Sequence, residues 1–252
     1  MCYNTPMSDI LFIGKDLPDS IDFAEGLASI NRNVFTSTKD ETEAENFAAE
    51  NIFSATWNKT SAISARSFLI KAETKFTDIN EYLLYFDSYY YSTKFELDKT
   101  EYVTAATDSL ISSYQLFINE LLSRLEQKKE PSVIAFMAKT YPSKYEVLHN
   151  GTKGVNIHPA SNIVSAAQEA FLSLAENTST LVGERPYLSV LLSKCDYTNE
   201  LFSSEKQLAS WLAQGIDSIK GMKNHQTAKQ AGTWVKAGAK IPTGLSLFSL
   251  VR

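Results

Sequence analysis

The sequence of 252 residues has only two cysteines, Cys2 and Cys195, and one of them lies next to the first residue. Two such cysteines form no disulfide framework, and the composition fits a protein of the reducing cytoplasm. The histidines are equally scarce: three are scattered along the chain, without acids or cysteines at the spacing of metal ligands. The sequence therefore predicts no metal site.

Long apolar runs and an excess of basic residues are also missing. The apolar stretches are far shorter than a membrane span, and residues 1–9 lack the basic and apolar regions of a signal peptide. The net charge of −5 argues against a nucleic-acid partner. No acidic residue follows Asp217, whereas lysines and Arg252 do. This basic segment is either a solvated face or a surface for an anionic substrate or partner.

Short apolar runs alternate with longer stretches of helical periodicity along the whole chain. Strands are predicted over residues 10–13, 34–36, 52–55, 82–86, 132–137, 187–192 and near 245–250. Helices are predicted over residues 21–28, 41–50, 62–76, 103–125 and 163–176, with another that opens at Ser204. Alternating strands and helices indicate a doubly wound parallel sheet. With no repeat or linker in view, we expect one domain over residues 1–252.

One helix start carries a partly preserved motif, His158-Pro159-Ala160-Ser161-Asn162. It resembles the Tyr-x-Ala-Ser-Lys segment of the short-chain dehydrogenase/reductase family, with histidine and asparagine in place of the tyrosine and the lysine. The order and spacing of the predicted elements resemble this family over nearly the whole chain. The resemblance implies a Rossmann-like, three-layer fold of about seven parallel strands with helices on both faces. It also implies NAD or NADP at the carboxyl ends of the strands.

The same resemblance points to catalytic positions. His158 would act as the general acid, with Asn162 beside it; the alternative is that His158 merely precedes Pro159 at the helix entry. The family's catalytic serine should follow the fifth strand, where this chain has an alanine, and Thr140 or Ser143 would have to replace its hydroxyl.

Cofactor contacts are carried over in the same way. The first strand is followed by one of the family's three glycines, and small hydroxyl residues before a lysine at the end of the second strand favour NADP slightly. The expected contacts are Gly14, Lys15, Ser20, Ser37, Thr38, Lys39, Asp87 and Thr198. Gly14 is alternatively a structural turn, residues 37–39 an ordinary solvated turn, and the chain one that binds no cofactor.

Bulky tyrosines follow the fourth strand where the family has Asn-Asn-Ala-Gly. Tyr89, Tyr90 and Tyr91 would crowd a cofactor, although a tyrosine cluster at the mouth of a sheet is suited to stacking on a planar ligand. Tyr90 and Lys94 satisfy the Tyr-x-x-x-Lys pattern by letter, but they follow the wrong strand, and we interpret this match as a coincidence.

Two helices are apolar on more than one side, which indicates that each needs cover on more than one side. They span residues 100–128 and 160–176, and in the family they form the subunit interface. We therefore expect a homodimer or homotetramer, with a monomer covered by loops as the alternative.

Five signature features of the family are replaced together: two glycines, the asparagine motif, the serine and the Tyr-Lys pair. We predict a catalytically degenerate relative, either a pseudoenzyme or a sensor for a nucleotide or small ligand. The alternatives are a divergent NAD(P)-dependent oxidoreductase for a small carbonyl or hydroxyl substrate and a non-catalytic interaction subunit.

Overall fold

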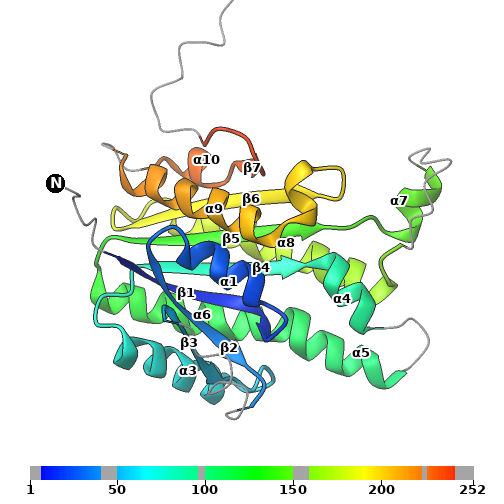
Figure 1. Ribbon diagram of the computed structural model, residues 1–252, viewed down its shortest axis with the longest axis horizontal. Helices are drawn as coiled ribbons and strands as arrows, with labels where there is room; N and C mark the ends of the chain where they lie inside the picture. Colours follow the sequence, from blue (N-terminus) through cyan, green and yellow to red (C-terminus); the bar gives the residue numbers. More distant parts are fainter. Residues whose placement is uncertain (1–6, 41–49, 96–99, 150–158, 223–225, 242–252) are drawn as a thin grey trace, which may run out of the picture.

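The computed structural model describes residues 7–40, 50–95, 100–149, 159–222 and 226–241. Seven parallel strands form one sheet in the order β3-β2-β1-β4-β5-β6-β7. The predicted Rossmann-like doubly wound sheet is thus confirmed (Figure 1). The strands are β1 (Ser8–Leu17), β2 (Arg32–Thr38), β3 (Ile52–Thr56), β4 (Glu81–Asp87), β5 (Ser132–Thr140), β6 (Leu188–Asp196) and β7 (Trp234–Lys236).

Helices cover both faces of the sheet, and each face has its own apolar core. On one face α1 (Ile21–Ala28) and α9 (Glu205–Lys220) pack side by side. On the other lie α3 (Ala62–Lys75), α6 (Ser113–Lys128) and α8 (Asn162–Val182). Shorter helices are α4 (Ser88–Lys94), α5 (Thr100–Thr107), α7 (Lys144–His149) and α10 (Ala228–Ala231).

The two long helical segments after β4 and β5 lie where the sequence predicted helices. A π-helical turn, Asp108–Ser112, joins α5 to α6, so the chain is helical throughout residues 100–128, as predicted. The hydroxyl of Ser161 caps α8 by accepting a hydrogen bond from the backbone N–H of Val164. This helix ends at Val182, six residues beyond its predicted end at residue 176.

Gly14 lies inside β1 rather than in the turn that follows, which corrects the prediction of a strand over residues 10–13. A Cβ atom at this position would stand 2.7 Å from the carbonyl oxygen of Tyr85 on β4. Only glycine lets the two strands approach so closely. The chain therefore continues as a strand to Leu17, and the turn to α1 comes at residues 18–20.

The remaining differences from prediction concern element ends. Several strands run further toward their carboxyl ends than predicted, β5 to Thr140 and β6 to Asp196. The last described strand, β7, was not predicted, whereas the strand expected near residues 245–250 lies outside the described residues. Most of the helix predicted over residues 41–50 also lies outside them. Ser204 caps α9 through the N–H of Gln207, as predicted.

Candidate functional site

The carboxyl ends of the strands form the edge at which open α/β sheets bind ligands. These ends point toward the side of the molecule on which α7 lies (Figure 1). The strand order reverses between β1 and β4, because β2 and β3 lie on one side of β1 and β5 to β7 on the other side of β4. A dinucleotide would be expected in the crevice above these two strands.

Three buried charged side chains and one partly buried one, Glu205, meet at this crevice. We call the four the carboxyl-edge quartet: Lys15, Asp87, Lys139 and Glu205. The Nζ atom of Lys15 donates a hydrogen bond to the carboxylate of Glu205 and lies 3.4 Å from Oδ2 of Asp87. Nζ of Lys139 lies 3.3 Å from the same Asp87 oxygen and 3.5 Å from Oε1 of Glu205. The quartet joins three adjacent strands to the first turn of α9.

The pKa values of the two carboxylates of the quartet are shifted in opposite directions. Burial alone would raise the pKa of Asp87, but the ammonium groups of Lys139 and Lys15 outweigh it and hold that pKa below its ordinary value. At Glu205 burial dominates over Lys15, so its pKa is raised. The hydroxyl of Tyr85 donates to both carboxylates, at 3.1 and 3.2 Å. Its pKa is raised by burial and by the two acids, so it stays a neutral donor.

A second set of contacts holds the end of β1 to the neighbouring β2. The carboxylate of Asp16 accepts hydrogen bonds from the hydroxyl of Ser37 at 2.6 Å and from Nζ of Lys59 at 2.9 Å. Lys59 also donates to the backbone carbonyl of Gly14 at 3.0 Å. Ser37 and Gly14, both predicted cofactor contacts, are thus tied together through Asp16 and Lys59.

A third contact joins the turn after β1 to α4. The hydroxyl of Tyr90 donates to Oδ2 of Asp19 at 2.5 Å, and Nζ of Lys94 lies 3.5 Å from the same oxygen. Burial and the Asp19 carboxylate raise the pKa of Tyr90. Proton transfer near neutral pH needs a pKa shifted the other way, which supports the interpretation of the Tyr90-x-x-x-Lys94 pattern as a coincidence.

The other predicted cofactor contacts come from three segments: the start of α1, the end of β2 and the turn after β6. Ser20 is fully buried at the start of α1, and its hydroxyl has no partner among the described residues. Thr38 is the last residue of β2, and its hydroxyl donates to the carbonyl of Asp40 at 3.2 Å, whereas the next residue, Lys39, is exposed. Thr198 is exposed as well, and its hydroxyl and N–H both donate to the carboxylate of Asp196.

Two of the three predicted catalytic residues, Asn162 and Thr140, lie within the described ranges. Asn162 is the exposed first residue of α8, and His158 lies outside the described residues. Thr140 is a buried residue at the end of β5, opposite Asp196 in the sheet. Cys195 is fully buried, and burial raises the pKa of its thiol to about 12, so it stays an unreactive thiol.

Lys139 and Glu205 were not predicted to be site residues, although both belong to the quartet. Lys139 has a visible signal, a lysine directly after six apolar residues of a strand, but that strand was predicted to end before it. Glu205 has no distinguishing signal, because an acid in the first turn of a capped helix is common for reasons of helix electrostatics. Only the packing of α9 against α1 brings it over β1.

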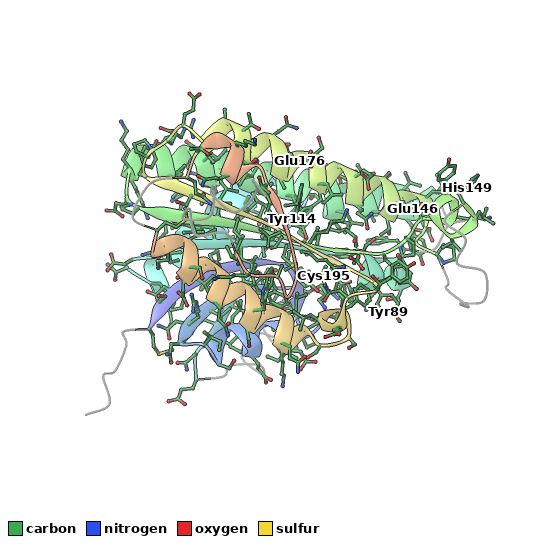
Figure 2. The ribbon with its side chains drawn as sticks, turned by 90° about the horizontal axis from the view of Figure 1, so that it is seen from above. Tyr89, Tyr114, Glu146, His149, Glu176 and Cys195 are labelled. Carbon is green, nitrogen blue, oxygen red and sulfur yellow. The ribbon has the colours of Figure 1, made fainter. Side chains whose placement is uncertain are left out.

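Four aromatic rings pack against one another beside the quartet, where the Phe202 ring contacts Lys139. We call them the aromatic mouth: Tyr89, Tyr141, Tyr197 and Phe202. They come from α4, from the residues after β5 and β6, and from the short 3-10 helix before α9. The ring of Tyr141 lies 5.0 Å from that of Tyr89 and 6.1 Å from that of Tyr197, in both cases edge to face. Figure 2 shows Tyr89 at the end of the molecule where α7 projects.

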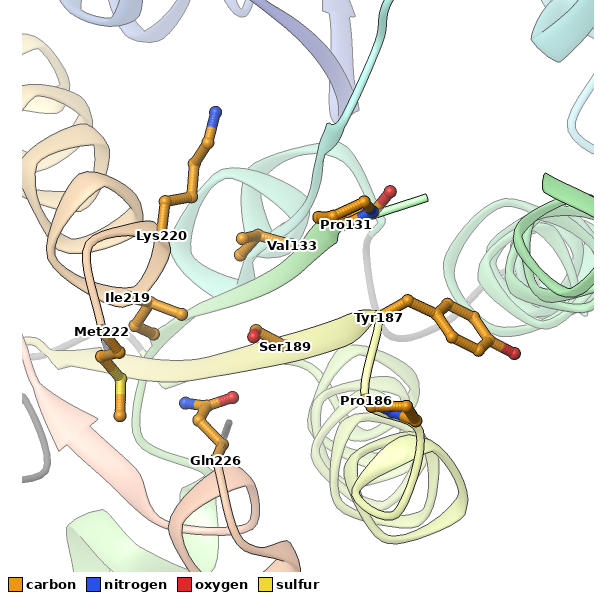
Figure 3. A pocket seen from close by; sticks show the side chains of 10 residues that line it. Pro131, Val133, Pro186, Tyr187, Ser189, Ile219, Lys220, Met222 and Gln226 are labelled. Carbon is orange, nitrogen blue, oxygen red and sulfur yellow. The ribbon is translucent and has the colours of Figure 1, made fainter. Parts of the chain in front are cut away.

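Two cavities lie away from the quartet. One of about 250 Å³ opens at the opposite, amino edge of the sheet, between Val133, Ser189, Ile219 and Gln226 (Figure 3). A groove of about 390 Å³ runs between α6 and α8. Within the described ranges no cluster of acids, histidines and cysteines suits a metal ion, and no helix there is long and apolar enough to cross a membrane.

Known structures share this architecture at low sequence identity. A short-chain dehydrogenase from Mycobacterium smegmatis is 12% identical with a TM-score of 0.62, covering 93% of each chain. A 3-ketoacyl-(acyl-carrier-protein) reductase from Brucella melitensis, complexed with NADH, is 10% identical with a TM-score of 0.59, covering 91% of this chain and 96% of its own. A short-chain dehydrogenase/reductase from Serratia marcescens is 11% identical with a TM-score of 0.58, covering 91% of this chain and 95% of its own.

The search of family models and the search of curated proteins match nothing to this sequence. The structural likeness nevertheless extends over nearly the whole of each chain.

Proposed function

We propose that this chain, which has the fold of the short-chain dehydrogenases/reductases, is a non-catalytic protein whose dinucleotide crevice is closed by its own side chains. The single observation that carries the proposal is the carboxyl-edge quartet. Lys15 and Asp87, two residues expected to contact a cofactor, are instead buried against each other and against Lys139 and Glu205.

The residues at the crevice do not fit a pyrophosphate. A dinucleotide brings two negative charges, which need free N–H groups or cations. Here each lysine of the quartet is already neutralised, and the carboxylates of Asp16, Asp19, Asp87 and Glu205 stand in the same region. Binding would require breaking buried ion pairs and leaving their acids without partners, which costs several kcal/mol, on the order of 3–5.

The same reasoning holds for either cofactor. NADP would add a 2′-phosphate near the end of β2. Lys39 is exposed there, but the negative carboxylate of Asp16, held by Ser37 and Lys59, lies in the same region and opposes a phosphate. Tyr90 and Asn162 are also unsuited to proton transfer, since Tyr90 is paired with the carboxylate of Asp19 and Asn162 carries no charge.

Calorimetric titration with NAD, NADH, NADP and NADPH tests the proposal directly. We expect no saturable heat from any of the four with the purified protein. The matched control is Lys15→Met, which removes a cation without adding bulk and should also show none. Saturable binding to the wild-type protein that is weakened by Lys15→Met would contradict the proposal, because Lys15 would then be serving a ligand.

A second element of the proposal is self-association through α6 and α8. The groove between them is lined by Ile111, Leu122, Leu174 and Leu181, and Leu181 is 59% exposed. Such apolar surface on two long helices supports a homodimer. Sedimentation of a Leu181→Glu variant should show the monomer. Ile63→Glu, a change at a residue that is 78% exposed on α3, should leave the dimer intact; a monomeric wild-type protein would remove this element.

A further inference from the structure

The aromatic mouth has the composition of a ligand site and lies at the sheet edge where ligands of this architecture bind. Its rings come from four separate segments, each of which follows a different strand or precedes α9. Tyr89 is 47% exposed, and the other three rings are half-buried. The rings thus form a surface that is assembled by the fold and open to solvent.

Polar atoms at the mouth are available. No hydrogen bond joins the hydroxyls of Tyr89, Tyr141 and Tyr197 to another described residue, whereas those of Tyr85, Tyr90 and Tyr114 are all bonded within the protein. Burial and the neighbouring Tyr89 and Tyr197 raise the pKa of Tyr141. It therefore remains a neutral group able to donate and accept.

Charge around the mouth is balanced. Lys139 lies 4.6 Å from the centre of the Phe202 ring, on the inner side, and its ammonium group is held by Asp87 and Glu205. Asp196, next to Tyr197, pairs with Lys236 at 3.4 Å. Neither an anion nor a cation would find an unpaired opposite charge among these groups.

We propose that the aromatic mouth binds an uncharged ligand with a planar ring, stacked against Tyr89 and Tyr141 and hydrogen-bonded by the tyrosine hydroxyls. Aromatic rings favour offset or edge-to-face contact with another π system, and Tyr89 and Tyr141 already stand at 62° to each other. An incoming ring can therefore contact a face of one and an edge of the other. This site lies beside the closed crevice and does not require that it open.

Ligand-observed NMR and calorimetry with indole as the probe would test this inference. We expect saturable indole binding, at least about tenfold weaker in Tyr141→Leu and in Tyr89→Leu. Tyr141→Phe keeps the ring and should retain most of the affinity. The control is Tyr145→Leu, at a tyrosine on α7 that is 69% exposed and outside the mouth.

Three further probes separate the ligand classes. Cyclohexanol has a similar size without a planar ring, and benzoate and tetramethylammonium carry opposite charges. Indole binding that exceeds all three supports the proposal. Equal binding of cyclohexanol, tighter binding of either ion, indole binding insensitive to Tyr89 and Tyr141, or no indole binding would each overturn it. The NAD(P) titrations are a separate experiment. A negative indole result therefore does not contradict the closed crevice, and NAD(P) binding would not contradict indole binding.

Discussion

A network of charged side chains lies at the carboxyl edge and another at the amino edge of the sheet, and α9 contributes to both. At the carboxyl edge stands the quartet with Asp87, the last residue of β4. At the amino edge stands a second group, which we call the amino-edge network: Arg32, Glu81, Asp217 and Lys220. Here Glu81 is the first residue of β4, and Asp217 and Lys220 come from the last turn of α9. One helix is thus fastened to the sheet at both of its ends.

The two networks differ in how well their cations are satisfied. Arg32 donates to Glu81 at 3.1 Å, to both carboxylate oxygens of Asp217 and to the carbonyls of Ile30 and Ala213. Burial alone would lower the pKa of Arg32, but its acids raise it. The lysines of the quartet are point charges, and several of their contacts are 3.3–3.5 Å long.

Under the proposed function, this difference separates a structural joint from a ligand site that is closed by side chains. The amino edge of such sheets is not where ligands bind, and its fork-shaped arginine bonds fasten helix to strand. The carboxyl edge is the ligand edge, and there the chain supplies both signs of charge itself.

The largest expected effect comes from breaking the amino-edge network. Arg32→Leu leaves the fully buried carboxylate of Glu81 with Lys220 as its remaining partner. We expect the free energy of unfolding in urea to fall by about 3–5 kcal/mol. Lys206→Ala, which removes an exposed pair with Glu25, should cost less than about 1 kcal/mol. Similar losses for the two variants would show that burial does not distinguish these ion pairs.

Lys15→Met should have an intermediate effect. It leaves Asp87 and Glu205 to share Lys139, but Glu205 can take up a proton because its pKa is already raised. We expect a loss of about 2 kcal/mol in the same urea assay, smaller than for Arg32→Leu. A loss as large as that of Arg32→Leu would mean that the two networks are equally rigid, and the comparison between them would fail.

The smallest effect is a pH dependence of opposite sign for the two acids of the quartet. The folded state binds a proton at Glu205 more readily than the unfolded chain does. Its ionisation therefore destabilises the fold as pH rises above its ordinary pKa of 4.5. Asp87 has a lowered pKa, so its stabilising contribution is present above 3.8 and is lost as pH falls through its folded pKa.

Urea unfolding of Glu205→Gln and Asp87→Asn over a range from about pH 2 to pH 7 measures this. Relative to wild type, Glu205→Gln should gain stability as pH rises above 4.5, and Asp87→Asn should lose most at neutral pH. Parallel curves for the two variants would contradict the opposite pKa shifts of Glu205 and Asp87.

Local patterns predicted the sheet because its evidence is local. The buried run from Leu83 to Phe86 and the stripe around Phe117 each show their period within a few residues. Element ends were less predictable: β1 continues through Gly14 because the backbone of Tyr85, far along the chain, comes close to it. Gly14 was interpreted as the end of a strand, whereas its missing side chain lets β1 and β4 approach each other closely.

The candidate site was predictable only in part. Lys15 and Asp87 were singled out from the sequence, but as separate contacts for a cofactor. Their partners Lys139 and Glu205 come from positions 52 and 118 residues beyond Asp87, by difference of their numbers. No pattern of short range can report a pair of that separation.

The sequence by itself determined which segments become strands and helices, and with them the parallel sheet, because hydrophobic period and capping residues act over a few residues. Tertiary structure alone decided what those strands present at their ends. It brought α9 against α1, set Glu205 over Lys15, and gathered Tyr89, Tyr141, Tyr197 and Phe202 at one mouth. Burial and charge pairing are properties of that assembled neighbourhood, so the chemistry of this edge belongs to the fold and not to any single segment.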